Sequence, residues 1–291
     1  MWNGNHTIYE ILILNTKIQI LPLVSILVFF LAGPLIIIFF VSFWDYTEFS
    51  LIPDFVFTNY IEIFESKVTY YIYLSTLKFA SLTWFFSLII GFGVAYFLAF
   101  HVRTTRWQII LFLICTIPFW TSNIIRMIAW IPVLGRHGLI NSTLIKLGLI
   151  QEPIEWLLYS DFAVILAFVH LYALFMVVPI FNSMMRIDKE VLEAARDAGA
   201  SPLQTLSHII IPLCRPGIAI GTIFIISLVM GDFVTVQAMS GGQSASVGVA
   251  MNHKRALLQY PAAAADAVIL LLVVLTMVAM LMRAVNIRKE L

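Results

Sequence analysis

The chain alternates between long apolar segments and shorter polar ones. Six apolar segments approach the ~20 residues that a helix needs to cross the hydrocarbon core of a bilayer. They are residues 20–43, 73–100, 109–130, 162–184, 217–239 and 262–283. This pattern predicts an all-α integral membrane protein with six transmembrane helices, forming a single transmembrane domain over residues 1–291. Residues 185–216 are polar and predict a loop outside the membrane.

The composition supports a membrane protein and excludes several other classes. The chain is 61% hydrophobic and 11% charged, whereas soluble domains carry about 25% charged residues. The net charge of +1 offers no bulk attraction for nucleic acid. Cys115 lies in an apolar span and Cys214 in a polar loop, so neither a disulfide nor a metal site is expected. The first apolar segment exceeds the ~7–15 residues of a cleavable signal core, so we expect a retained span.

The distribution of Lys and Arg predicts the orientation. Six spans place both termini on one side, and more than half of the Lys and Arg residues fall on that side. The positive-inside rule therefore predicts cytoplasmic termini and a cytoplasmic loop 185–216. The outer loops carry Asp45, Glu48, Asp54, Glu62, Glu65, Glu152, Glu155 and Asp161. These acids form either a solvated face or a vestibule that concentrates a cationic solute.

The first half of the polar loop predicts a short helix. Asp188 is a plausible N-cap for a helix over residues 189–198, and Gly199 is its natural stop because glycine adopts the left-handed conformation. Small side chains on such a helix let the backbone of another protein approach closely. The small residues are Ala194, Ala195 and Ala198. A docking element and an ordinary connector between spans explain this helix equally well.

A second helix is predicted directly after it. Ser201 is its N-cap, Pro202 takes the first helical position, and Gln204 completes a capping box. Pro212 and Pro216 are expected to end this helix before the fifth span.

The same loop carries a family resemblance. The stretch EAARDAGAS, followed by IIIP, resembles the EAA loop of the permease subunits of binding-protein-dependent ABC importers. Glu193, Ala194, Ala195, Gly199, Ile209 and Pro212 match the family pattern in register, and Ile211 replaces its usual Leu. The resemblance implies a type I importer fold and a coupling helix that sits in a groove of a cytoplasmic ATPase. The implied coupling residues are Glu193, Ala194, Ala195, Asp197, Gly199, Ala200 and Ser201.

Three further stretches narrow the resemblance. IPFWTSNIIRMIAW (117–130), LGRHGLIN (134–141) and MGDFVTVQAMSGG (230–242) resemble the spermidine/putrescine-type branch of these permeases. The resemblance covers residues 75–284. It implies that the chain is one of two homologous permease subunits, each of which forms half of a pathway for a polyamine such as putrescine or spermidine. It also implies an ATPase dimer, an extracytoplasmic solute-binding protein and a lipid-embedded position in the bacterial inner membrane. Opine-like and phosphonate permeases in the same branch leave the solute open.

The chain carries no motif for catalysis of its own. It has no G-x-x-x-x-G-K-[ST] phosphate loop, no nucleophile–base constellation and no His/Glu metal motif. We therefore expect no bound cofactor, with ATP and Mg²⁺ held by the partner ATPase. An ion-gradient-driven secondary transporter or channel is the alternative. It would need ion-coordinating residues at broken helices in repeated halves, and no internal repeat is present.

Polar residues inside the spans are candidates for the solute pathway, because a charge at the centre of a membrane helix costs about 2.5–3.5 kcal/mol. Asp232 either meets a cationic solute, orders a helix break beside the gate, or pairs with another span or subunit. Asp266 is expected near water at the outer end of the sixth span. It is either a second acidic contact or part of a vestibule or interface. The predicted pathway residues are Asp232, Thr235, Gln237, Asp266, Asn123 and Tyr172.

Three further positions affect the shape of the pathway. Arg126, near the outer end of the third span, is expected to reach the membrane interface. His170 in the fourth span is more consistent with packing than with ligand binding. Val236 stands where the branch usually has Pro, and it predicts that the helix continues there.

Overall fold

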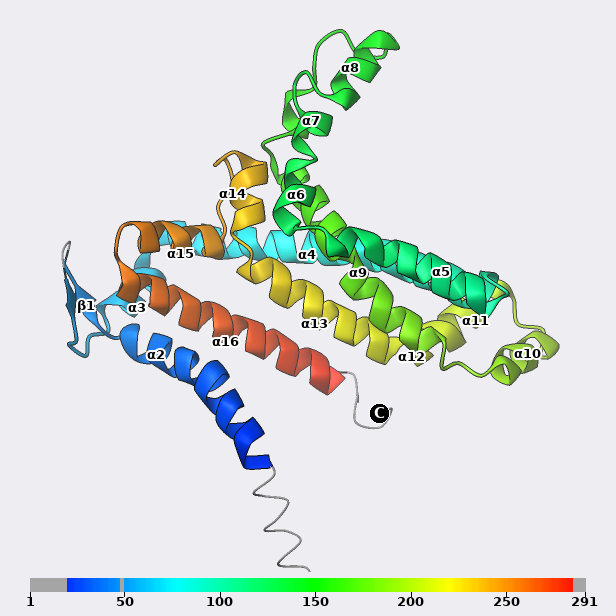
Figure 1. The fold of residues 1–291 in the computed structure, drawn as a ribbon, viewed down its shortest axis with the longest axis horizontal. Helices are drawn as coiled ribbons and strands as arrows, with labels where there is room; N and C mark the ends of the chain where they lie inside the picture. Colours follow the sequence, from blue (N-terminus) through cyan, green and yellow to red (C-terminus); the bar gives the residue numbers. More distant parts are fainter. Residues whose placement is uncertain (1–19, 48–49, 285–291) are drawn as a thin grey trace, which may run out of the picture. The chain divides into compact units, whose positions relative to one another are not determined.

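The computed structural model describes residues 20–47 and 50–284 and is almost entirely helical (Figure 1). The exception is a short antiparallel ribbon of β1 (Asp45–Tyr46) and β2 (Leu51–Ile52), in which Asp45 lies opposite Ile52. The predicted all-α fold is therefore confirmed. Glu48, one of the predicted outer-loop acids, lies outside the described residues.

Four helical segments are long and apolar enough to cross a membrane by themselves. They are Ile20–Val41, Lys67–His101, Glu155–Met184 and Tyr260–Arg283. Two pairs of consecutive helices are also long and apolar enough when each pair is taken together, although each is bent at a short break. The bend is 91° between Thr105–Trp120 and Asn123–Lys146, and 65° between Pro202–Leu213 and Arg215–Gly231. The described residues thus hold up to six spans, and the fold reaches six when each bent pair counts as one.

The third predicted span is broken in the middle. The sequence predicts a helix through residues 109–130, but α5 (Thr105–Thr116) tightens into the 3₁₀ turn η3 (Ile117–Trp120) and Thr121 is extended. A new helix, α6 (Asn123–Ile128), then leaves in another direction. Pro118 lies in the 3₁₀ turn, and proline contributes no N–H to continue an α-helix. The prediction of a continuous span is therefore wrong.

The fifth predicted span is also broken. The helix α13 (Arg215–Gly231) ends at the extended residue Asp232, and α14 (Val234–Ser240) follows. Val236 lies inside α14 and is buried, so the helix does continue there. The interruption occurs four residues earlier, at Asp232, the charged residue for which a helix break is one of the predicted alternatives.

The chain forms two compact units. Unit 1 contains Met1–Glu65 and Lys254–Ile269, and unit 2 contains Ser66–His253 and Leu270–Leu291, within the described residues. In unit 1 the buried side chain of Asn59 donates to the carbonyl oxygens of Ser42 and Trp44 at 3.1 and 2.9 Å. These bonds satisfy carbonyl groups where α2 (Gly33–Val41) ends.

The core of unit 2 is built on three helices, α4 (Lys67–Tyr96), α9 (Asp161–Met184) and α13. The helices approach closely because small residues lie between them. An added side-chain carbon at Gly91 or Gly221 would collide with Met176 of α9. Trp84 of α4 donates to Thr222 of α13 at 2.8 Å, which fixes the two helices relative to each other.

The remaining elements include the long helix α16 and a set of shorter helices and turns. They are η1 (Val28–Ala32), α3 (Thr58–Glu65), η2 (Phe97–His101), α7 (Ile131–Leu134), α8 (Leu139–Lys146), η4 (Glu155–Leu157), α10 (Lys189–Asp197), α11 (Pro202–Thr205), η5 (Leu206–Ile210), α12 (Ile211–Leu213), α15 (Val247–Ala256) and α16 (Tyr260–Ala284).

Candidate functional site

The polar loop forms the helix that the sequence predicts. Asp188 takes the N-cap position of α10, although its side chain makes no capping hydrogen bond. Of the implied coupling residues, Glu193, Ala194, Asp197, Gly199 and Ser201 are exposed, and Ala200 is half-buried. Ala195 is buried instead of lying on the surface, so the expectation for this residue is wrong. The side of α10 that carries Leu192 packs on the core of unit 2, which leaves Ala194 and Ala198 as its small exposed side chains.

The turn after α10 is closed by local hydrogen bonds. Gly199 has a φ of +78°, as predicted, and its N–H donates to the carbonyl oxygen of Arg196 at 2.9 Å. The N–H of Ala200 donates to the carbonyl oxygen of Ala195 at 3.0 Å. This is the Schellman pattern, in which a left-handed glycine lets the last carbonyl groups of a helix find donors.

The second helix also begins as predicted. Ser201 accepts from the N–H of Gln204 at 3.3 Å, and the side chain of Gln204 accepts from the N–H of Ser201 at 2.8 Å. Pro212 does not end the helix, because it lies within α12. The 65° bend follows at Cys214, which is fully buried and not part of an exposed polar loop. Pro216 lies in the first turn of α13.

A cavity of about 510 Å³ lies beside α10. Its other wall is the segment 99–108, which contains the end of η2 and the start of α5. The charged residues of its lining are Arg103, Lys189, Glu193 and Arg196. An exposed helix next to a cavity lined by charged residues is a surface on which another protein could dock.

Asp232 is the centre of a polar cluster at the break of the fifth span. Tyr172 of α9 donates its hydroxyl hydrogen to Oδ2 of Asp232 at 2.7 Å. Thr235 donates its N–H to Oδ1 at 3.0 Å and its hydroxyl hydrogen to Oδ2 at 2.7 Å. The Asp232 side chain therefore caps the first turn of α14 and ties it to α9. Two of the predicted alternatives hold together, since Asp232 orders a helix break and pairs with another span. Gln237 of α14 is exposed.

Arg126 does not extend to the surface of the chain. Its side chain is buried, at 7% exposure, because the 91° bend between α5 and α6 turns it toward α9. It donates to the Asn123 side chain and, at 3.5 Å, to the carbonyl oxygen of Leu171. Its Nε has no hydrogen-bond partner among the described residues. Asn123, a predicted pathway residue, thus holds Arg126 in place. On the exposed side of α9, His170 accepts from the indole N–H of Trp130 at 3.0 Å.

Asp266 lies in unit 1 and is buried, so the expectation that it lies near water is wrong. Lys254 approaches it with its Nζ 2.7 Å from Oδ2. A buried carboxylate needs such a partner, because desolvation without one would be costly. Asn123, Tyr172, Asp232, Thr235 and Gln237 all belong to unit 2.

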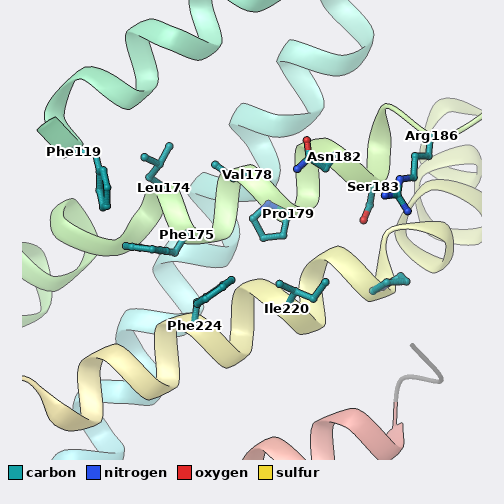
Figure 2. Close-up of a pocket in the computed structure, with 11 residues that line it drawn as sticks. Phe119, Leu174, Phe175, Val178, Pro179, Asn182, Ser183, Arg186, Ile220 and Phe224 are labelled. Atoms are coloured by element: carbon teal, nitrogen blue, oxygen red, sulfur yellow. The ribbon is translucent and has the colours of Figure 1, made fainter. Parts of the chain in front are cut away.

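A second cavity of about 510 Å³ runs between α9 and α13 (Figure 2). Figure 2 shows Phe119, Phe175 and Phe224 at one end, and Asn182, Ser183 and Arg186 at the other. The sequence analysis missed this cavity. One signal was present, because positions 175, 179 and 182 recur at helical spacing along one side of α9, and Arg186 follows just after its end. No sequence signal placed Phe119 beside them.

Comparison with known proteins agrees with this architecture. Residues 87–289 match the family model described as "Binding-protein-dependent transport system inner membrane component". The chain is 34% identical over 231 residues to the spermidine/putrescine transport system permease protein PotB of Escherichia coli K12, covering 79% of this chain and 82% of PotB. It is 29% identical over 150 residues to a putative 2-aminoethylphosphonate transport system permease protein, PhnU, of Salmonella typhimurium, covering 52% of each protein.

The fold is likewise similar to that of a solved transporter. A chain in the crystal structure of a bacterial ABC transporter that imports alginate superimposes with a TM-score of 0.74 at 18% identity, and 96% of each chain is covered. This similarity shows the fold alone. The family match and the identity to PotB show the relationship, and the chain belongs to the family of binding-protein-dependent transport system inner membrane components, as a permease subunit of an ABC importer.

Proposed function

We propose that this permease subunit imports a polyamine such as putrescine or spermidine. Its family works with an ATPase and a solute-binding protein. The observation that carries the solute class is the 34% identity to PotB, a spermidine/putrescine permease, over 79% of the chain. We further propose that the chain pairs with a second homologous permease, each lining half of the pathway, and that lipid surrounds the pair. ATP and Mg²⁺ belong to the ATPase dimer, and this chain binds no cofactor.

The helix α10 is the proposed contact with the ATPase. Its exposed Glu193 and Ala194, the turn at Gly199 and the neighbouring charged cavity supply a rigid, small-residue surface. The Schellman turn and the capping box join α10 to α11 without a flexible linker. Positive residues on this side favour a cytoplasmic position for α10 and for both termini.

In this proposal, a movement of α10 is transmitted through the bend at Cys214 to the span that contains α13. The segment α11–α12 leads into α13, and α13 ends at Gly231, beside the Asp232 cluster. ATP-driven closure of the ATPase would therefore displace a helix whose far end is tied to α9 through Tyr172. In this proposal the cluster of Asp232, Tyr172 and Thr235 borders the pathway, together with Gln237 of α14 and Asn123 of α6, a helix that contacts α14.

The acidic outer residues give partial support to a cationic solute. Asp161 is not available, because Lys78 contacts it at 2.5 Å and Ser244 donates to it. Glu155 lies 3.6 Å from Arg136. The acids for which no ion pair is found within the described ranges are Asp45, Asp54, Glu62, Glu65 and Glu152. These five are the proposed attraction for a polycation, whereas Asp266, predicted as a second acidic contact, is buried and already paired with Lys254.

Uptake of labelled putrescine and spermidine tests the proposal. Cells with and without this chain are compared, before and after ATP depletion, with labelled 2-aminoethylphosphonate as a parallel solute. We expect polyamine uptake that requires both the chain and ATP. Uptake of 2-aminoethylphosphonate alone would overturn the solute class. Chain-dependent uptake that persists without ATP and follows an ion gradient would contradict the proposed ATP-driven coupling.

A further inference from the structure

The cavity between α9 and α13 has an aromatic end built from three separate elements. Phe119 comes from η3, Phe175 from α9 and Phe224 from α13. The ring centroids of Phe119 and Phe175 are 5.4 Å apart at an interplanar angle of 78°, and those of Phe175 and Phe224 are 5.7 Å apart at 42°. Phe119 and Phe224 remain 44% and 45% exposed. Their rings therefore present surface to the cavity instead of filling the core.

These rings continue toward a carboxylate. The ring centroids of Phe175 and Tyr172 are 6.3 Å apart, and the hydroxyl of Tyr172 donates to Asp232 at 2.7 Å. The face of an aromatic ring carries partial negative charge, which attracts cations within about 6 Å of its centroid. Asp232 lies beyond Tyr172 and does not line the cavity, so the ring faces themselves are the surface that suits an organic cation.

The ring of Phe119 already lies close to a cation, the guanidinium group of Arg126. The guanidinium carbon of Arg126 lies 5.9 Å from the centroid of Phe119. Arg126 lines a separate cavity of about 380 Å³, which shares Phe119 and Leu174 with the first. Phe119 is thus part of the wall between the two cavities. Arg126 lies on the side of the second cavity, where it lines the wall with Phe119.

The opposite end of the cavity would repel an ammonium group. Arg186 lies there with Asn182 and Ser183 (Figure 2). It forms no ion pair within the described part of the chain. The walls in between are apolar, including Val178, Pro179 and Ile220. An elongated amine would therefore place an ammonium group at the aromatic end and its methylene groups along these walls.

We propose that Phe119, Phe175 and Phe224 form an aromatic box that binds an alkylammonium group of the solute through cation–π contacts during transport. This inference rests on the proposed polyamine function and assigns the box as a determinant of specificity for it. The ligand class is a primary or secondary alkylammonium ion attached to an unbranched aliphatic chain. Uncharged or anionic solutes gain nothing from such a box.

Graded fluorination of Phe175 tests the box, because fluorine weakens the negative ring face while hardly changing its shape. The complete importer is reconstituted in liposomes with one, two or three fluorines on this ring. Putrescine transport is measured at saturating ATP and binding protein. We expect the rate to fall with each fluorine, reaching about fivefold to thirtyfold below wild type. Phe175→Leu should show a similar loss, and Phe175→Trp should retain transport.

A matched control uses Phe181, also on α9. Phe181 stacks on Phe112 with centroids 5.2 Å apart at 25°, and neither residue lines this cavity. The same fluorinated series at Phe181 should leave transport within about twofold of wild type, and basal ATPase activity reports assembly of each complex. A wild-type importer that transports putrescine, with a flat series at Phe175, would overturn the box alone. A wild-type importer without ATP-dependent putrescine uptake would overturn the proposed solute and the box together.

Discussion

Helices end at Gly199 and at Asp232, two positions that belong to proposed functional regions, and the two breaks are held in different ways. At Gly199 the φ of +78° and the hydrogen bonds of the turn involve residues within five positions of one another. At Asp232 the break is held partly by Thr235, three residues away, and partly by Tyr172, sixty residues away. The first break is a local structure, and the second depends on the packing of α9 against α13 and α14.

This difference separates two tasks. A local break keeps its shape while the whole element moves, which suits a joint that transmits force to or from another protein. A break held by a distant side chain changes when two spans shift relative to each other, which suits a gate. The Tyr172–Asp232 hydrogen bond is therefore a contact that a movement of α13 relative to α9 would strain.

The largest expected effect is that of Asp232→Ala. It leaves the hydroxyl groups of Tyr172 and Thr235 and the N–H of Thr235 without their acceptor, which costs roughly 2–4 kcal/mol. We expect a clear fall in the thermal unfolding midpoint of the purified complex and at least about a tenfold loss of uptake. Asp232→Asn is the control, because it keeps one acceptor oxygen and should fall between wild type and Asp232→Ala. Equal stability of Asp232→Ala and wild type would show that the cluster does not hold the break.

Tyr172→Phe should have the second-largest effect. It removes only the long-range bond and leaves the local cap from Asp232 to Thr235 intact, at a cost of about 1.5 kcal/mol. We expect uptake to change more than the unfolding midpoint, since the α9–α14 tie is lost while α14 still begins normally. Wild-type transport in this variant would argue against the Tyr172–Asp232 bond as part of a gate.

Gly199→Ala should lower stability by a similar amount, about 1–2 kcal/mol, from the left-handed backbone alone. The space around Gly199 is open within the chain, so no internal clash adds to this cost. Gly199→Asn is the control, because Asn tolerates this conformation better. We expect stimulation of the ATPase by loaded binding protein to fall for Ala and to recover for Asn. If Asn were as impaired as Ala, contact with the partner and not backbone strain would explain the loss.

Ser201→Ala should have the smallest measurable effect, about 1 kcal/mol, through loss of the capping box. Asp188→Ala is its matched control, since Asp188 takes an N-cap position without making a side-chain capping bond. Thermal unfolding and uptake should therefore be unchanged in Asp188→Ala and slightly reduced in Ser201→Ala. Identical behaviour of the two variants would mean that the Ser201 cap contributes nothing.

Sequence reasoning succeeded where the structural cause is local. It predicted the apolar segments, the stop at Gly199 and the capping box at Ser201, because hydrophobic length and capping chemistry act within a few residues. It failed for Arg126, which is buried because α6 bends away from α5, and for Asp266, which is buried beside Lys254. Neither the direction of a bend nor a partner twelve positions away is visible in apolar periodicity.

The amino-acid sequence by itself determined the membrane class, the helical elements of the polar loop 185–216 and the family resemblance. Each of these depends on residue type and short spacing, which the linear chain already contains. Only the tertiary structure decided where the third and fifth spans break, which side chain holds Asp232, and that Phe119, Phe175 and Phe224 share one cavity. Those features arise when helices far apart in sequence pack together, because the contacts that stabilise them do not exist until the fold brings them within reach.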